Sequence, residues 1–250
     1  ISGLCISRPK TDFQGLFGYA SGATIRRTNL DNVHILGQTY CGGVSGYAED
    51  SSIDEINFQG TIIAYSFSGG IAGVVKNGSV QRCWADVDMM SFNAYAGGIT
   101  GNIASSTSIS GVVSNSGSTG AIEGSNNVGG VVGMISWGYV LNSYSHASIS
   151  GSYQAGGLVG TNGWDYPGHI SRCFSTGLVT LKTGGSLAGG LVGYFVNGSV
   201  LESYWDTQSS GMPTSSGTGA TGKTTTQMMQ QSTFERWNFD TLWQMGTRGY

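Results

Sequence analysis

The feature that most constrains this chain is a five-residue pattern, Gly-Gly-aliphatic-x-Gly, which occurs seven times. Measured between the second glycines, the spacings are 28, 27, 28, 32, 27 and 33 residues. Only the first copy departs from the pattern, with Gln14 in place of the leading glycine. A regular period of this length is the sequence signature of a repeat architecture, in which each repeat is one structural unit.

A second column of residues follows the glycine patterns, and all of its members are β-branched. The members are Ile25, Ile53, Val80, Ile109, Val140, Ile170 and Val200. Because β-branched residues and glycine dominate, and no helical apolar period appears before the last forty residues or so, each repeat is predicted to form about three short strands. Such a repeat is too short to bury its own apolar columns, so it must stack on its neighbours.

The sequence therefore predicts an all-β fold, a right-handed parallel β-solenoid of about seven coils. The repeats are expected to cover residues 1–205, with coils that start near residues 15, 43, 70, 98, 130, 157 and 190. The chain contains 43 glycines, and the repeats explain their number. We expect glycine at the corners, where the backbone needs a positive φ or a close approach to the next coil. These structural corner glycines are Gly43, Gly70, Gly98, Gly130, Gly157 and Gly190.

Residues 206–250 have a different character and are predicted to form a small C-terminal cap. Residues 209–222 are rich in Ser, Thr and Gly, which is typical of a loop. Helix formers follow Thr224, which predicts a short helix with Thr224 as its N-cap. The aromatic residues that come next would cover the open end of the solenoid, and the alternative is a docking surface for another domain.

Two segments of the repeats resemble a known family. Gly-Gly-Leu-Val-Gly at 156–160 and at 189–193, with Ile-Ser-Arg-Cys-Phe-Ser-Thr-Gly at 170–177, is similar to the GLUG repeat family of large secreted and surface proteins of bacteria and archaea. Ser-Tyr-Trp-Asp-Thr at 203–207 and Trp-Asn-Phe-Asp at 237–240 resemble the tail that closes such arrays. The resemblance implies an extracellular location and a role in adhesion or surface architecture. It implies no catalytic residues. Because the tail of this family usually runs on for several residues, we also expect that part of the parent protein is missing.

Charge, apolar runs and Cys and His spacing argue against several kinds of partner. It has 11 Lys and Arg against 14 Asp and Glu, a net charge of −3, and no basic run, so we expect no nucleic acid partner. No stretch approaches 18 consecutive apolar residues, so no membrane span is expected. The Cys and His residues show no metal-ligand spacing, so neither a metal site nor a cofactor is expected.

An aromatic column gives the main candidate for a contact surface. The position after the column that contains Cys83 and Cys173 is aromatic in several repeats. If the cysteine column faces inward, strand alternation turns this one outward, although a bend between the two would reverse it. The resulting stripe would stack on sugar rings or on a neighbouring rod, and the alternative is a ladder satisfied by its own stacking. Its members are Trp84, Tyr144, Phe174 and Tyr204.

Catalysis is not expected, although carboxylates are present. Asp86, Asp88, Asp165 and Arg172 could serve a polysaccharide lyase or hydrolase only if they converged on one face of the solenoid. The function we expect is that of an extracellular structural or adhesive segment of a cell-surface assembly. It would bind another surface protein, or copies of itself in a filament or sheath, and a polysaccharide is a further candidate partner. The alternatives are the enzyme and a non-catalytic carbohydrate-binding module.

Overall fold

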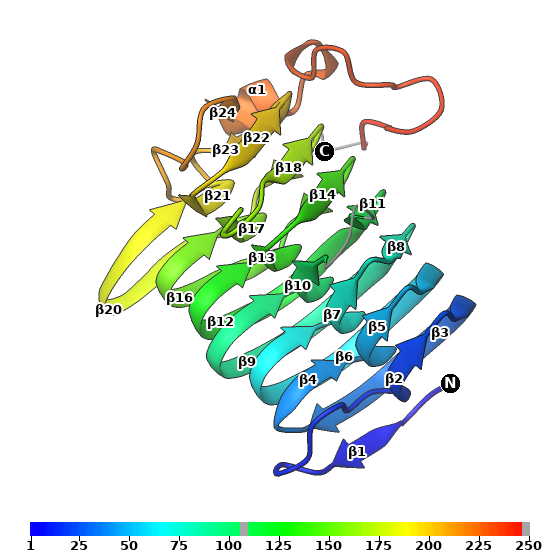
Figure 1. The fold of residues 1–250 in the computed structure, drawn as a ribbon. Coiled ribbons are helices and arrows are strands. Elements are labelled where there is room, and N and C mark those ends of the chain that lie inside the picture. Colours follow the sequence, from blue (N-terminus) through cyan, green and yellow to red (C-terminus); the bar gives the residue numbers. More distant parts are fainter. Residues whose placement is uncertain (106–109, 247–250) are drawn as a thin grey trace.

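The computed structural model describes residues 1–105 and 110–246, and it confirms the parallel β-solenoid (Figure 1). A typical coil contains three strand segments, as in β7 (Ala72–Lys76), β8 (Ser79–Gln81) and β9 (Trp84–Gly97). Equivalent strands of successive coils pair in parallel, as when Gly97 of one coil lies between Gly69 and Gly129. This register repeats the glycine spacing of the sequence.

The strands form two sheets. One has seven strands in the order β2 (Phe17–Ser21), β5 (Ser45–Glu49), β7, β10 (Thr100–Ala104), β13 (Val132–Ile135), β17 (Val159–Asn162) and β21 (Val192–Phe195). The other contains β1 (Cys5–Ser7), β3 (Thr24–Leu36), β4 (Thr39–Gly42), β6 (Ser52–Gly69), β8, β9, β11 (Gly111–Ser114), β12 (Gly117–Gly129), β14 (Gly138–Leu141), β15 (Tyr144–Ser145), β16 (Ser148–Gly156), β18 (Gly168–Ser171), β19 (Phe174–Ser175), β20 (Val179–Gly189), β22 (Gly198–Leu201), β23 (Ser203–Asp206) and β24 (Ala220–Lys223).

The core consists of aliphatic columns that run along the solenoid axis. The residue after each glycine pair points inward, and from the second coil onward it is completely buried. These residues are Val44, Ile71, Ile99, Val131, Leu158 and Leu191. Stacking therefore supplies the burial that one repeat alone could not reach.

The glycine pairs are needed for close approach. None of the six predicted corner glycines has a positive φ. A Cβ on Gly98 would lie 2.1 Å from the carbonyl oxygen of Gly130, and one on Gly43 would lie 2.4 Å from that of Gly70. Each side chain would thus collide with the backbone of the next coil.

The fourth coil corrects one part of the sequence alignment. Val113, in β11, pairs with both Val80 and Val140, so it occupies the β-branched column. The residue assigned there from the sequence, Ile109, lies outside the described residues. As a consequence Gly117, which pairs with Trp84 and Tyr144, occupies the aromatic column. The longer spacing of this coil is taken up before β11, which the glycine spacing alone did not indicate.

The C-terminal segment covers the last coil and then turns along the side of the solenoid. Strand β24 pairs in parallel with β23, and the amide of Gly190 donates to the carbonyl oxygen of Thr214 at 2.9 Å. The predicted short helix is α1 (Thr225–Met228), with a capping box between Thr224 and Gln227, and a 3-10 helix follows at Gln231–Thr233. No helix of the described residues is long and apolar enough to cross a membrane.

Candidate functional site

The predicted aromatic stripe faces outward from the coils but lies largely beneath the C-terminal segment. Tyr144 pairs with Phe174, which in turn pairs with Tyr204 in the next coil. Phe174 is 5% exposed and Tyr204 is 8% exposed. Both pack against Phe234 and Trp237, with ring centroids between 5.4 and 6.2 Å apart.

This cluster is separate from the solenoid core. Burial raises the pKa of Tyr144 and lowers the pKa of the neighbouring His146, because both sites disfavour charge. Trp84 belongs to an earlier coil than the other members of the stripe, and it is half-buried. The stripe is therefore mainly an internal interface, which leaves little of it open to a partner.

Another aromatic column is partly open to solvent, with its first ring, Phe13, 39% exposed and the other three half-buried, and we call it the aromatic ladder. It consists of Phe13, Tyr40, Phe67 and Tyr95, and each of the last three stands two residues before a glycine pair. Successive ring centroids are 4.9, 5.0 and 4.4 Å apart, so the rings stack from coil to coil. Their spacing of 27 or 28 residues is visible in the sequence, before the glycine patterns, whereas the predicted stripe lies after them.

The ladder residues make a sharp corner of each coil. Phe13, Tyr40, Phe67 and Tyr95 have φ values of 58°, 60°, 54° and 63°. A bulky residue in this left-handed region costs about 1–2 kcal/mol, yet the sequence uses rings here and keeps glycine for the tighter contacts that follow. The equivalent residues of the later coils are Asn127, Gln154 and Leu187, with φ values of 53°, 50° and 64°.

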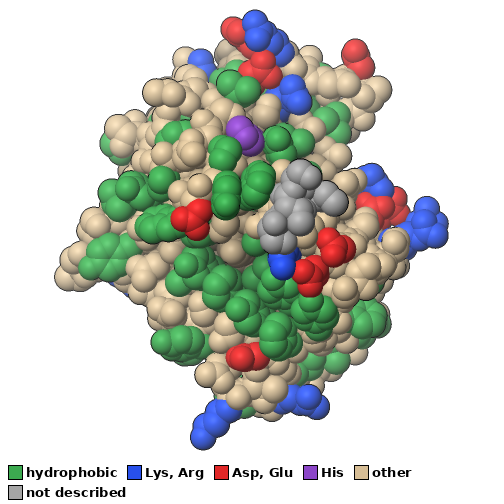
Figure 2. All heavy atoms as spheres, viewed as in Figure 1, with side chains coloured by type: hydrophobic (Ala, Val, Ile, Leu, Met, Phe, Trp, Pro, Cys, Tyr) green, Lys and Arg blue, Asp and Glu red, His purple; other side chains and the backbone are tan. Residues whose placement is uncertain are grey.

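A second pair of rings widens the ladder over the seven-stranded sheet. Tyr19 and Tyr47 pair in neighbouring strands, with centroids 5.4 Å apart and planes 6° apart, and Tyr47 lies edge-on to Tyr40 at 5.5 Å. Glu49 accepts hydrogen bonds from the hydroxyl of Tyr19 and from Lys76. These bonds lower the pKa of Glu49 and raise that of Tyr19. On the face shown in Figure 2, hydrophobic side chains gather in front of β5, β7 and β10.

Beside the ladder lies a groove of about 670 Å³, which we call the amide groove. Four rings line it: Phe67, Tyr95, Tyr153 and Trp164. Five amide side chains also line it: Asn93, Asn102, Asn126, Asn127 and Gln154. Asp165 is the one charged residue among its lining residues in the described part of the chain. The groove thus combines flat rings with uncharged amide groups and a single carboxylate.

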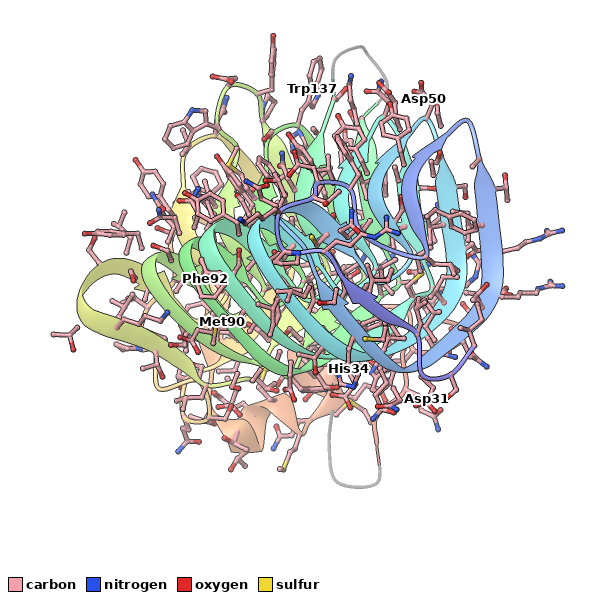
Figure 3. All side chains as sticks on the ribbon, turned by 90° about the horizontal axis from the view of Figure 1, so that it is seen from below. Asp31, His34, Asp50, Met90, Phe92 and Trp137 are labelled. Carbon is pink, nitrogen blue, oxygen red and sulfur yellow. The ribbon has the colours of Figure 1, made fainter. Side chains whose placement is uncertain are left out.

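The catalytic candidates occupy different surroundings. Asp86 accepts hydrogen bonds from Gln59 and Thr119, and it shares a shallow hollow with Asp88. That hollow includes Asp31 and His34, which lie at an edge of the solenoid away from Trp137 and Asp50 (Figure 3). Asp165 lines the amide groove instead.

Arg172, the basic candidate, makes polar contacts with residues of the coils on either side of its own. It donates to Asn142 at 3.1 Å and pairs with Glu202 at 3.6 Å. Neither of these two partners, among the described residues, is one of the other three catalytic candidates.

The described residues contain no group of three or more His, Cys, Asp or Glu side chains placed to hold a metal ion. Cys41, Cys83 and Cys173 are buried, and burial raises the pKa of each thiol to about 12. They pack as small apolar side chains, because a thiolate would be strongly disfavoured at these positions.

Comparisons with known proteins agree with this architecture. The model of the GLUG motif matches residues 151–181, which form about one coil. None of the curated proteins compared with the chain matches it. The chain is similar in structure to a "putative immunoglobulin A1 protease" from Bacteroides ovatus, with a TM-score of 0.64 and 18% identity over 96% of this chain and 86% of that one. At this identity the likeness extends to the fold alone. The chain thus contains a GLUG motif within a parallel β-solenoid fold.

Proposed function

We propose that the chain is an extracellular, non-enzymatic adhesive segment of a surface protein and that it binds through the aromatic ladder. The observation that carries this proposal is the stack of rings at Phe13, Tyr40, Phe67 and Tyr95. Rings held on successive coils of a paired sheet lose little conformational freedom when a partner binds. Flat aromatic surface is also what recognition sites use most, for proteins and for sugars.

The repeats themselves supply replacements for testing the ladder. Asn127 occupies the column of Tyr40, and Val74 pairs with Tyr47 in the next strand. The double variant Tyr40→Asn and Tyr47→Val therefore removes two rings with residues that the fold already accepts at these positions. A matched control is Tyr139→Ala, which removes a ring that is 37% exposed in β14, outside the ladder.

Adhesion is measured with beads coated with the purified chain, on mucin-coated surfaces and on cell layers. We expect the unaltered chain and the control to adhere and the double variant to lose most of the adhesion. Equal adhesion of the double variant would remove the ladder from the proposal. Antibody labelling of intact source cells tests the extracellular location, and labelling that requires permeabilised cells would contradict it.

A cleaving enzyme is the rival from another class. The name of the Bacteroides ovatus protein suggests proteolysis, but only the fold supports that link. Asp86 and Asp165 line different hollows, which gives a polysaccharide-cleaving site little support. Cleavage of immunoglobulin A1 or of a polysaccharide by the purified chain, abolished by an Asp165→Asn change, would favour the enzyme.

Self-association is a second candidate, favoured at the N-terminal end. There β1 pairs only with β3, and β2 pairs only with β5, among the described residues. Phe17 and Tyr19, on β2, are about half-exposed. An unpaired strand edge with exposed rings is able to pair with a second chain.

A further inference from the structure

From the amide groove we infer a binding site for a neutral oligosaccharide. The inference rests on the proposed adhesive function and names the kind of ligand that this face would bind. Sugars have apolar C–H faces, which pack on aromatic rings, and hydroxyl groups, which both donate and accept hydrogen bonds. A sugar site therefore needs flat rings beside polar groups that are not already paired.

The rings of the groove are available to a ligand. Trp164 is 53% exposed and Tyr153 is 46% exposed, and both line the groove. Phe67 and Tyr95 stack on each other at 4.4 Å, with ring planes 26° apart, and form one wall. A sugar ring that packed on Trp164 would cover apolar surface that now faces water.

The amides of the groove have unused hydrogen-bonding capacity. Among the residues that the structure describes, the side chain of Asn102 makes one hydrogen bond, in which it accepts from the hydroxyl of Ser136 at 3.1 Å. The other four amide side chains make none with those residues. Each amide offers two donor hydrogens and an acceptor oxygen, which matches the mixed character of sugar hydroxyls.

The charges of the groove select among sugars. Asp165 is its one charged lining residue, and no Lys or Arg lines the described groove. The carboxylate of a uronic acid, or a sulfate, would face Asp165 without a cation to pair with it. The lining therefore favours a neutral chain of sugars.

The groove also has a direction. Phe67, Tyr95, Asn127 and Gln154 occupy one position on four successive coils, each two residues before a glycine pair. Coils stack at about 4.8 Å, so these residues extend over about 14 Å along the solenoid axis. A trough of this length suits several linked sugars better than a single one.

The experiment uses the whole chain on an array of neutral and acidic glycans, followed by calorimetry with the neutral oligosaccharides that bind. The groove variants are Trp164→Ala and Asn102→Val. Valine is matched to the second position, because Asn102 pairs with Val74 in one neighbouring strand and Met134 in the other. Tyr139→Ala is again the control, and circular dichroism of every variant shows whether it has folded.

We expect neutral oligosaccharides to bind, each groove variant to weaken the binding by about tenfold or more, and the control to bind as before. No binding of any neutral glycan would overturn the inference, and so would binding that the groove variants leave unchanged or that is confined to acidic glycans or peptides. Bead adhesion that persists without glycan binding would show that the inference fails while the adhesive function stands. Loss of both would count against the adhesive function itself.

Discussion

Single residues recur along this chain because each coil repeats the contacts of the coil before it. The corner position and the glycine pair that follows it show this, because one carries a large ring and the other has no side chain. The left-handed corner carries a large ring at Tyr40, whose side chain projects outward. Two and three residues later the backbone touches the next coil, and Gly42 and Gly43 leave the necessary space.

Close packing at the glycine pairs leads to a first prediction. Gly98→Ala should destabilise the fold by about 3 kcal/mol or more, because its Cβ would lie 2.1 Å from the Gly130 oxygen and 2.6 Å from the Ser118 Cβ. Gly22→Ala is the control, since its φ is 60° but nothing lies within 4 Å of an added Cβ. That change should cost only about 1–2 kcal/mol. Denaturant unfolding measures both, and equal losses would contradict the packing argument.

The cysteines allow a second prediction at the same scale. Cys41, Cys83 and Cys173 are buried with the pKa raised to about 12, whereas Cys5 is exposed. At pH 8 the native chain should therefore react with a thiol reagent at one site, and the denatured chain at four. Mass spectrometry after labelling identifies the site. Rapid labelling of Cys173 in the native chain would show that the coils open more readily than their packing implies.

At the scale of elements, residues 225–246 of the C-terminal segment are held by an aromatic cluster that is separate from the solenoid core. Phe234 and Trp237 cover Phe174 and Tyr204 on the outer side of the coils. The indole nitrogen of Trp237 also donates to the carbonyl oxygen of Glu202 at 2.9 Å. Because this cluster is small and lateral, it can open without disturbing the aliphatic columns.

Trp237→Ala should therefore release residues 225–246 while the coils stay folded. The change removes a ring that is 8% exposed and should cost about 3–5 kcal/mol of local stability. Hydrogen exchange should become fast over residues 225–246 and stay slow in β14 and β18. Leu242→Ala, at a side chain 42% exposed, is the control and should change neither. Unfolding of the coils in the Trp237 variant would show that the two clusters are coupled.

At the scale of the whole molecule, the two ends of the solenoid differ. The last coil is covered, because β24 pairs with β23 and Trp205 donates to the carbonyl oxygen of Met212 at 2.9 Å. The first coil leaves β1 and β2 with an unpaired edge among the described residues. We therefore expect the C-terminal segment to hinder head-to-tail stacking of copies, which is how an unlimited rod of coils would grow.

Removal of residues 208–250 should consequently cause association. Both ends would then present strand edges, and parallel pairing between copies would extend the solenoid. Sedimentation and electron microscopy should show oligomers that lengthen with concentration for the shortened chain, and particles of limited size for the full one. A shortened chain that folds and stays monomeric would contradict this role of the C-terminal segment.

The sequence predicted much of the fold but less of the site. The period of the glycine pairs and the aliphatic residue beside each pair, such as Ile71 or Leu158, were sufficient to predict the coils. The aromatic ladder could have been found from its spacing. The amide groove could not, because Asn102 and Trp164 reach it from different coils and from a loop.

What the sequence determined by itself is the stacking, since identical positions in successive repeats must meet when the repeats pair in register. Tertiary structure decided which outward column stays partly open to solvent. Phe174 is as aromatic as Phe67, but residues some 60 positions later in the chain cover it. Local pattern cannot reveal such a contact, because it depends on where a non-repeating segment returns. It also decided the register of the fourth coil, where Val113 pairs with Val80 and Val140 although the glycine pairs alone do not place the extra residues of this coil.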